Sequence, residues 1–165
     1  MSTTEPTENI DTFPFTYLHI NPIYFTDHPK LIEIMNDDNR QYLHIIAQYR
    51  DNTFLIPFRS NMTHKFGYRF MPHDPKSKKG LDFSKALIIN DLPKYTLESQ
   101  KNIPQYQHNK IKQHSTVILR KFHNYVDEYI KYTAKEDPNF KRRIGRMSSL
   151  QNFHNELGIK ITPST

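Results

Sequence analysis

Residues Gln41 to Arg59, QYLHIIAQYRDNTFLIPFR, carry the strongest structural signal in the chain. Two apolar runs, 41–49 and 53–59, are rich in β-branched and aromatic residues and enclose a short polar stretch. This arrangement is typical of a β-hairpin. We therefore predict two antiparallel strands that are joined by a turn at 50–52.

Before the hairpin, the sequence predicts one strand and one short helix. The strand is the alternating segment 15–20, FTYLHI, which the Asn-Pro dipeptide at 21–22 stops. Thr26 or Asp27 is expected to cap the helix, with Pro29 in its first turn. Four residues would form its apolar side: Leu31, Ile32, Ile34 and Met35.

After the hairpin, the sequence predicts an exposed basic loop at 76–80 and a strand at 86–89. From 105 to 134 the apolar period changes from two to 3.6, which indicates one long amphipathic helix. Six residues recur on its inner face: Ile111, Ser115, Ile118, Phe122, Tyr125 and Tyr129. A second helix is expected at 148–157, capped by the serine at its start and stopped by the following glycine. Strands followed by helices indicate an α+β fold with a mainly antiparallel sheet.

The composition favours a single domain, residues 14–158, between an acidic tail at 1–13 and a C-terminal tail at 159–165. Aromatic residues make up 13% of the chain, which argues against wholesale disorder although only 36% is hydrophobic. No apolar run approaches the ~20 residues that span a bilayer, and the polar N-terminal segment differs from a signal peptide. The lack of cysteine excludes disulfides and thiolate metal sites and is compatible with the cytoplasm, where we expect the protein.

The charge is distributed unevenly along the chain. Residues 1–58 hold three basic and eight acidic residues, a net charge of −5, whereas 59–165 hold twenty basic and nine acidic residues, a net charge of +11. A basic surface of this size favours polyanions such as nucleic acid. The alternative is an ordinary soluble domain with many surface lysines.

Polar side chains gather where the second hairpin strand is predicted to end. Within eleven residues the sequence offers an arginine, a hydroxyl, an amide, an imidazole and further cations: Arg59, Ser60, Asn61, His64, Lys65, Tyr68 and Arg69. Cations neutralise phosphate oxygens and an imidazole transfers protons near neutral pH, so the set suits a phosphodiester. Hairpin geometry also brings Arg40 close to Ser60. The alternative is a polar loop after an edge strand.

Further basic residues are predicted to contact an RNA backbone. They lie in the basic loop, on the long helix and in the segment 141–146, where the alternative is a solvated linker: Lys76, Lys78, Lys79, Lys112, Arg120, Lys121, Lys141, Arg142, Arg143 and Arg146. Cations of this kind position a strand without reading its sequence. Four aromatic residues could stack on unpaired bases: Tyr42, Phe66, Tyr68 and Phe140.

Several enzyme classes fit the sequence poorly. His108, His114 and His123 are spaced by six and nine residues, not by the four that present two imidazoles to one metal ion. Ser60 lacks the Gly-x-Ser-x-Gly context of a serine hydrolase, and no glycine-rich phosphate loop is present. We therefore expect neither a metal nor another cofactor.

The order of these segments resembles the ToxN/AbiQ-like endoribonuclease toxins of type III toxin–antitoxin systems, most closely the CptN/TenpN branch. The matching pieces, which cover residues 15 to 155, are YLHINPIYF, the hairpin QYLHIIAQYRDNTFLIPFRSN, HKFGYRF, GLDFSKALIIND and the basic helix that follows. The resemblance implies a strongly twisted, partly barrel-like antiparallel sheet flanked by helices. It also implies a metal-independent ribonuclease that processes a small repeat RNA, is silenced by it in a closed protein–RNA assembly, and acts in phage defence.

By the same resemblance, Ser60 corresponds to the active-site serine, Arg59 to the residue before it and Arg40 to a basic residue before the second strand. The chain departs from the family at Met62, where ToxN carries a lysine. The implied reaction is attack of the ribose 2′-hydroxyl on the adjacent phosphorus. His64 is then predicted to act as base or acid and Ser60 to hydrogen-bond the phosphate. Arg59, Arg40 and Lys65 would stabilise the developing charge.

Two other functions remain open on the sequence. A non-catalytic RNA-binding module would use the same basic face and show steep salt dependence without cutting RNA. An adaptor would bind an acidic protein through the basic helix and have no affinity for RNA.

Overall fold

The computed structural model describes residues 17–35, 42–99 and 103–160. In these segments seven strands form one open sheet in which each strand pair is antiparallel, in the order β4-β5-β3-β2-β1-β7, with β6 pairing with β3. The strands are β1 (Leu18–Ile20), β2 (His44–Tyr49), β3 (Asn52–Arg59), β4 (Gly67–Arg69), β5 (Gly80–Asp82), β6 (Leu87–Ile88) and β7 (Thr96–Glu98). The sheet is not closed into a barrel.

The predicted hairpin is confirmed as β2 and β3. Tyr49 pairs with Asn52, so Arg50 and Asp51 alone form the connection. Both have positive φ, 48° and 60°, as a type I′ turn requires. Arg50 is held there by an ion pair of 3.0 Å between its Nη2 and Oδ1 of Asp127.

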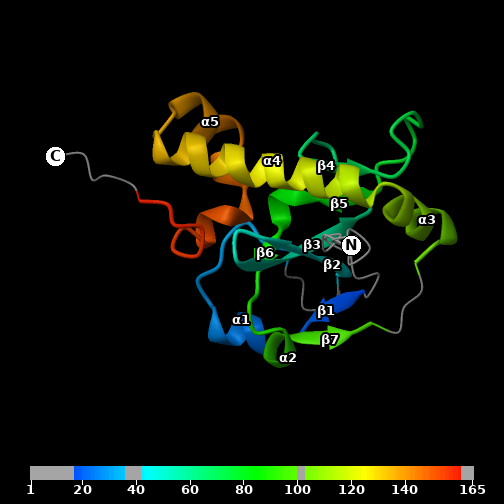
Figure 1. Ribbon diagram of the computed structural model, residues 1–165, viewed down its shortest axis with the longest axis horizontal. Coiled ribbons are helices and arrows are strands. Elements are labelled where there is room, and N and C mark those ends of the chain that lie inside the picture. The colour runs from blue at the N-terminus through cyan, green and yellow to red at the C-terminus, as the bar shows by residue number, and fades with distance from the viewer. Residues whose placement is uncertain (1–16, 36–41, 100–102, 161–165) are drawn as a thin grey trace, which may run out of the picture.

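The helices lie on both sides of the sheet (Figure 1). They are α1 (Ile23–Asp27), α2 (Leu92–Tyr95), α3 (Gln105–Gln113), α4 (Ser115–Ala134) and α5 (Pro138–Arg143), with short 3₁₀ turns η2 (Phe83–Lys85), η3 (Gly145–Met147) and η4 (Ser149–Asn152). The predicted apolar side of α4 packs on the sheet, where the ring of Phe122 meets Phe54 edge-on at 5.0 Å. None of the helices in the described segments is long and apolar enough to cross a membrane.

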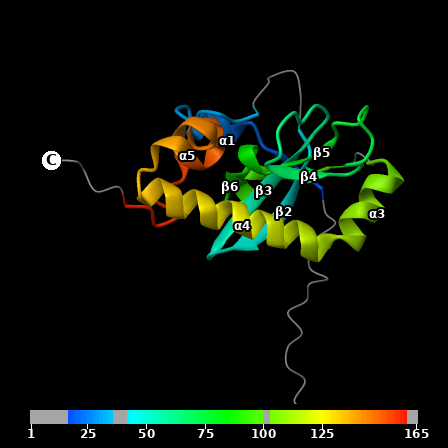
Figure 2. The same cartoon turned by 90° about the horizontal axis from the view of Figure 1, so that it is seen from above.

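The prediction of one continuous helix over 105–134 is wrong. The backbone of His114 leaves the helical region, with φ −111° and ψ 19°, so α3 ends and α4 begins around it. Seen from above, α3 turns away from the axis of α4 at this point (Figure 2). The apolar period gives no sign of the break, because Ile111 and Ile118 on either side are both buried.

Other boundaries also differ from the predictions. The predicted first helix is wrong in position: α1 runs from Ile23 to Asp27 with Pro22 at its N-cap, so Thr26 and Asp27 end the helix instead of capping its start. Glu33, with φ 56°, lies beyond it in irregular chain. The segment 148–157 forms only the 3₁₀ turn η4, although Ser148 caps it as predicted. Strand β1 is confirmed over residues 18–20, and 15–16 lie outside the described residues.

Candidate functional site

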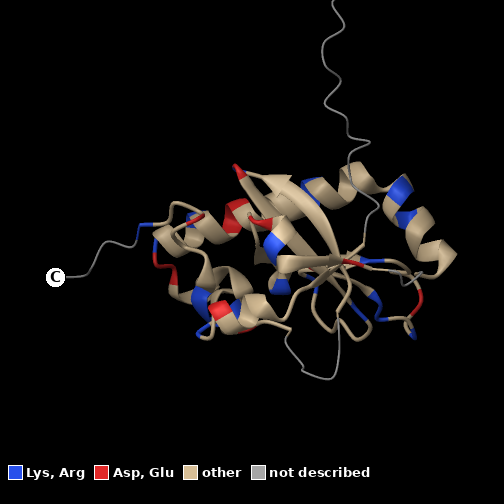
Figure 3. Ribbon diagram, turned by 90° about the horizontal axis from the view of Figure 1, so that it is seen from below, with Lys and Arg blue, Asp and Glu red and all other residues tan. Residues whose placement is uncertain are grey.

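Basic residues concentrate around α3. Figure 3 shows Lys and Arg segments on α3 and in the loop that follows β4, at the same end of the molecule. Between these elements and the beginning of α4 lies a cavity of about 370 Å³. Its wall is formed by Met62, His64, Lys65, Gly67, Tyr68, Arg69, Pro72, His73, Lys110, His114 and Lys121. We call this the α3 cavity.

The wall of the α3 cavity carries four permanent cations, three imidazoles and no carboxylate. The cations are those of Lys65, Arg69, Lys110 and Lys121, and none of them forms an ion pair with a carboxylate in the described parts of the chain. Like charges that line one cavity repel one another, whereas an anion in the cavity would be attracted by all of them. The arrangement is therefore suited to a phosphate group.

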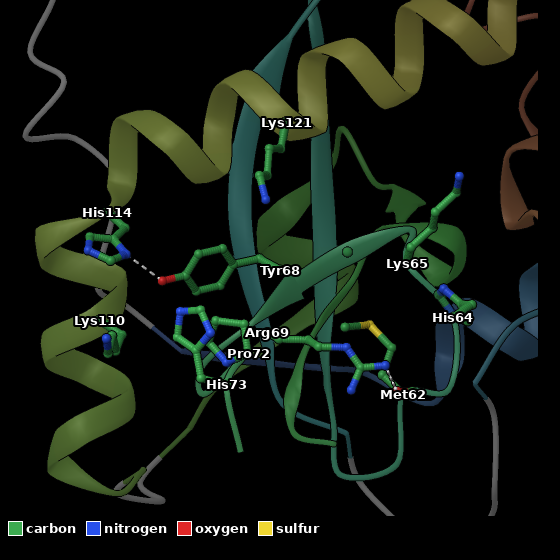
Figure 4. Close-up of a pocket in the computed structure, with 11 residues that line it drawn as sticks. Met62, His64, Lys65, Tyr68, Arg69, Pro72, His73, Lys110, His114 and Lys121 are labelled. Atoms are coloured by element: carbon green, nitrogen blue, oxygen red, sulfur yellow. Dashed lines mark hydrogen bonds between the residues drawn. The ribbon is translucent and has the colours of Figure 1, made fainter. Parts of the chain in front are cut away.

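Tyr68 and His114 form a short side-chain hydrogen bond in the wall of the α3 cavity. The Tyr68 hydroxyl, from strand β4, lies 2.6 Å from Nδ1 of His114 at the α3–α4 junction (Figure 4). Burial raises the pKa of the Tyr68 hydroxyl, so it stays protonated at neutral pH. The hydrogen bond fixes the orientation of the His114 ring relative to strand β4.

Arg69 is also held in a defined position. Its Nη2 donates a hydrogen bond of 2.6 Å to the backbone carbonyl of Met62. Met62 itself is fully buried, so its side chain faces the interior and does not take part in the charge of the cavity.

The predicted catalytic residues Arg59 and His64 converge on Asp82 of strand β5. Arg59 Nη1 lies 2.7 Å and His64 Nε2 lies 3.2 Å from Asp82 Oδ2, and the Ser84 hydroxyl donates to Oδ1 at 2.6 Å. Burial alone would raise the pKa of the Asp82 carboxyl, but hydrogen bonds from these three neighbours outweigh it and hold the pKa below its usual value. Asp82 is thus a buried carboxylate that three side chains, those of Arg59, His64 and Ser84, contact with hydrogen-bond donors.

His64 is engaged at both ring nitrogens. Its Nδ1 accepts a hydrogen bond of 3.0 Å from the backbone N–H of Phe66, which leaves Nε2–H to donate to Asp82. Neither nitrogen is therefore available to take a proton from a substrate in this arrangement. In Figure 4, His64 and Lys65 lie at the opposite end of the view from Lys110 and His114.

Ser60 lies in a second, smaller cavity of about 240 Å³. Arg59 and Ser60 at the end of β3 form its wall with six other residues: Tyr42, Leu43, Phe58, Lys79, Pro104 and Gln107. We call this the Ser60 cavity. It abuts the N-terminal half of α3 through Pro104 and Gln107, and the α3 cavity abuts the C-terminal half through Lys110 and His114.

The remaining predicted residues are dispersed, apart from Lys121 in the wall of the α3 cavity and Lys79 in that of the Ser60 cavity. Asn61 pairs through its backbone with Lys78. Six predicted basic residues are exposed on the loop and the two helices: Lys76, Lys78, Lys79, Lys112, Arg120 and Lys121. The predicted cluster Lys141, Arg142, Arg143 and Arg146 is exposed on α5 and η3, at the other end of α4 from α3 (Figure 1). Arg40 lies outside the described residues.

Several residues of the site were not found from the sequence. Lys110, His73 and His114 line the α3 cavity, and Asp82 with Ser84 anchors the predicted catalytic pair. Lys110 and His114 are four residues apart, a spacing that places both on one helix face. Comparing only the spacings between histidines does not find this pair. Asp82 gave no signal, because it is eighteen residues from its partner His64.

Comparisons of the chain with protein families, curated proteins and solved structures find no match. In the described segments, no three histidine, aspartate or glutamate side chains converge as metal ligands.

Proposed function

We propose that this protein is a metal-independent endoribonuclease toxin of a type III toxin–antitoxin system. The observation that supports it most is the α3 cavity, whose wall has three imidazoles, no carboxylate and four cations that form no ion pair among the described residues. Such a cavity favours a phosphodiester of a flexible strand, which RNA offers in its single-stranded regions. The toxin class itself comes from the sequence resemblance, together with a repeat RNA antitoxin, a cytoplasmic location and a role in phage defence.

The proposed reaction is internal attack by the ribose 2′-hydroxyl. The O2′–P bond forms as the P–O5′ bond breaks, giving a 2′,3′-cyclic phosphate and a 5′-hydroxyl end. Arg69, Lys110 and Lys121 would stabilise the charge that develops on the phosphate oxygens. Catalysis of this kind depends on cations that are held in position before the substrate binds. The hydrogen bond from Arg69 to the Met62 carbonyl holds the Arg69 guanidinium in this way.

The RNA strand is proposed to follow α3 and to contact both cavities. The Ser60 hydroxyl and the Lys79 ammonium would then bind the phosphate next to the one in the α3 cavity. Tyr42 and Phe58 in the Ser60 cavity offer aromatic surface for a base. Arg59 contributes less free charge than predicted, because Asp82 pairs with it.

The test is cleavage of a labelled repeat RNA from the upstream region of the gene by wild type, Ser60→Ala and Thr63→Ala. We expect Ser60→Ala to lower the cleavage rate about tenfold, because it removes one hydrogen bond to the phosphate next to the reacting one. Thr63, an exposed hydroxyl in the same segment that lines neither cavity, serves as the control and should keep the wild-type rate. Full activity of Ser60→Ala would contradict the assignment of Ser60.

A second function, that of a non-catalytic RNA-binding module, is favoured by one observation. The predicted proton carrier, His64, has both nitrogens in hydrogen bonds. Binding of a repeat RNA by purified protein without any cut would support this second function.

A further inference from the structure

We propose that His114, oriented by Tyr68, is the catalytic base for RNA cleavage in the α3 cavity. The inference rests on the proposed function and names the proton carrier of the same site. Neither ring nitrogen of His64 is free, so another group must accept the proton of the 2′-hydroxyl. Of the two other imidazoles in the cavity wall, only His114 has its ring fixed by a hydrogen bond to a described residue.

The contact with Tyr68 leaves the second nitrogen of His114 for chemistry. When Nδ1–H of His114 donates to the Tyr68 oxygen, Nε2 carries a lone pair and can accept a proton. A tyrosine hydroxyl also donates, so the same contact persists if the ring adopts the other tautomer. Tyr68 thus acts as a positioning residue, in the way that a second group orients the general base in hydrolase triads.

Both protons that move in this step are exchanged with side chains of the cavity wall. Nε2 of His114 takes the proton of the 2′-hydroxyl as the O2′–P bond forms. The P–O5′ bond breaks, and the leaving O5′ receives a proton from the imidazolium of His73, which is exposed in the same wall. One imidazole gains a proton and the other loses one, and water restores both states after the product leaves.

The titratable and charged groups that surround His114 come from three elements and one loop. They are Tyr68 and Arg69 on β4, Lys110 on α3 and Lys121 on α4, with His73 on the loop after β4. All except Tyr68 are cationic or become so on protonation. Together they would attract the phosphate next to the 2′-hydroxyl that His114 is proposed to deprotonate.

The structure provides a matched control for this proposal. Tyr17 and His108 form a second tyrosine–histidine hydrogen bond, also through Nδ1 of a histidine on α3, yet neither residue lines the α3 cavity or the Ser60 cavity. His108→Ala therefore removes the same kind of bond without touching the proposed site.

The experiment compares cleavage by wild type, His114→Ala, Tyr68→Phe and His108→Ala, each checked for folding by circular dichroism. Binding is measured separately with a 2′-O-methyl RNA that cannot be cut. We expect His114→Ala to lose at least about a hundredfold in cleavage rate, Tyr68→Phe about tenfold, and His108→Ala to match wild type. Binding of the 2′-O-methyl RNA should change less than about threefold in all of them.

Two further readouts separate catalysis from a structural role. Added imidazole should restore part of the cleavage by His114→Ala, and the acidic limb of the pH–rate profile should disappear in that variant. Wild-type cleavage by His114→Ala, or loss of cleavage with no rescue and a parallel loss of binding, would overturn the role of His114 while leaving the ribonuclease proposal intact. A wild-type protein that binds RNA but never cuts it would overturn both.

Discussion

Asp82 shows how a single buried residue organises the candidate site. Its carboxylate has no exposed surface and accepts hydrogen bonds from Arg59 on β3, His64 on the following loop and Ser84 on η2. A buried charge is tolerated only when such donors replace its water. Asp82 thereby fixes the end of β3, on which Ser60 depends, relative to the segment that enters the α3 cavity.

Replacement Asp82→Ala should destabilise the fold by about 3 kcal/mol, because it leaves buried donors without a partner. Urea denaturation followed by circular dichroism measures the change. Glu98→Ala, which removes an exposed carboxylate on β7 that forms no described ion pair, should have almost no effect. Equal urea midpoints for the two variants would contradict this role of Asp82.

His44 should make the fold sensitive to acid. Burial, partly opposed by a hydrogen bond to the Tyr42 carbonyl, lowers its pKa from 6.5 to about 4. The unfolded chain binds a proton below pH 6.5 and the folded chain does not until about pH 4. Stability is therefore complete above pH 6.5 and falls by roughly 3 kcal/mol as the pH drops to 4.

The test of His44 is urea denaturation of wild type and His44→Asn at several pH values. Asparagine keeps an N–H that can donate to the Tyr42 carbonyl but does not titrate. We expect a clearly smaller loss of stability between pH 6.5 and 4, with a remainder from His123 and His154, whose pKa values burial also lowers. The same pH slope in both proteins would show that His44 is not responsible.

At the scale of elements, strands β4 and β5 approach each other around glycine. A Cβ on Gly80 would lie 2.3 Å from the Tyr68 carbonyl oxygen and 2.8 Å from Cε of Met62. Met62 fills the space that Gly80 and Gly67 leave open. The strand that carries Tyr68 and Arg69 into the α3 cavity therefore depends on these glycines.

Gly80→Ala should cost about 3 kcal/mol of folding free energy, because the new methyl group meets backbone that cannot move aside cheaply. The control is Gly145→Ala, where the nearest atom to an added Cβ is 3.8 Å away. Thermal denaturation should give a lower midpoint for the first variant and an unchanged one for the second. A Gly80→Ala protein as stable as wild type would contradict the close approach of β4 and β5.

The sequence predicts elements whose signal is local and misses features that depend on distant contacts. The β2–β3 hairpin is readable because its turn and apolar runs are adjacent, and the face of α4 follows from a regular period. The break at His114 is not readable, since neither glycine nor proline marks it. The hydrogen bonds that occupy both ring nitrogens of His64 are equally unpredictable, because one of them requires Asp82 on another strand.

At the scale of the whole molecule, basic residues form two separate surfaces. The α3 cavity lies at the beginning of α4 and the exposed cluster Lys141, Arg142, Arg143 and Arg146 at its end (Figure 2). The 20 residues of α4 span roughly 30 Å. Under the proposed function, a short RNA bound in the α3 cavity would not contact the second surface, whereas a longer one would reach both.

Replacing Lys141, Arg142, Arg143 and Arg146 together by alanine should consequently weaken binding of a long repeat RNA about tenfold. Binding of an oligonucleotide of about four residues should stay unchanged, because it occupies one surface only. Fluorescence anisotropy at several salt concentrations measures both, and the salt slope for the long RNA should become shallower as phosphate contacts are lost. Equal weakening for the short and the long RNA would contradict the separation of the surfaces.

The central claim is that the α3 cavity and its surroundings cleave RNA through the ribose 2′-hydroxyl. The most direct measurement is to incubate purified protein with end-labelled repeat RNA in EDTA and to identify the chemical groups at both new ends. We expect 2′,3′-cyclic phosphate and 5′-hydroxyl ends, and no cut where a single 2′-deoxynucleotide replaces the attacking residue. Cleavage that stops in EDTA, or ends that carry a 5′-phosphate and a 3′-hydroxyl, would contradict it.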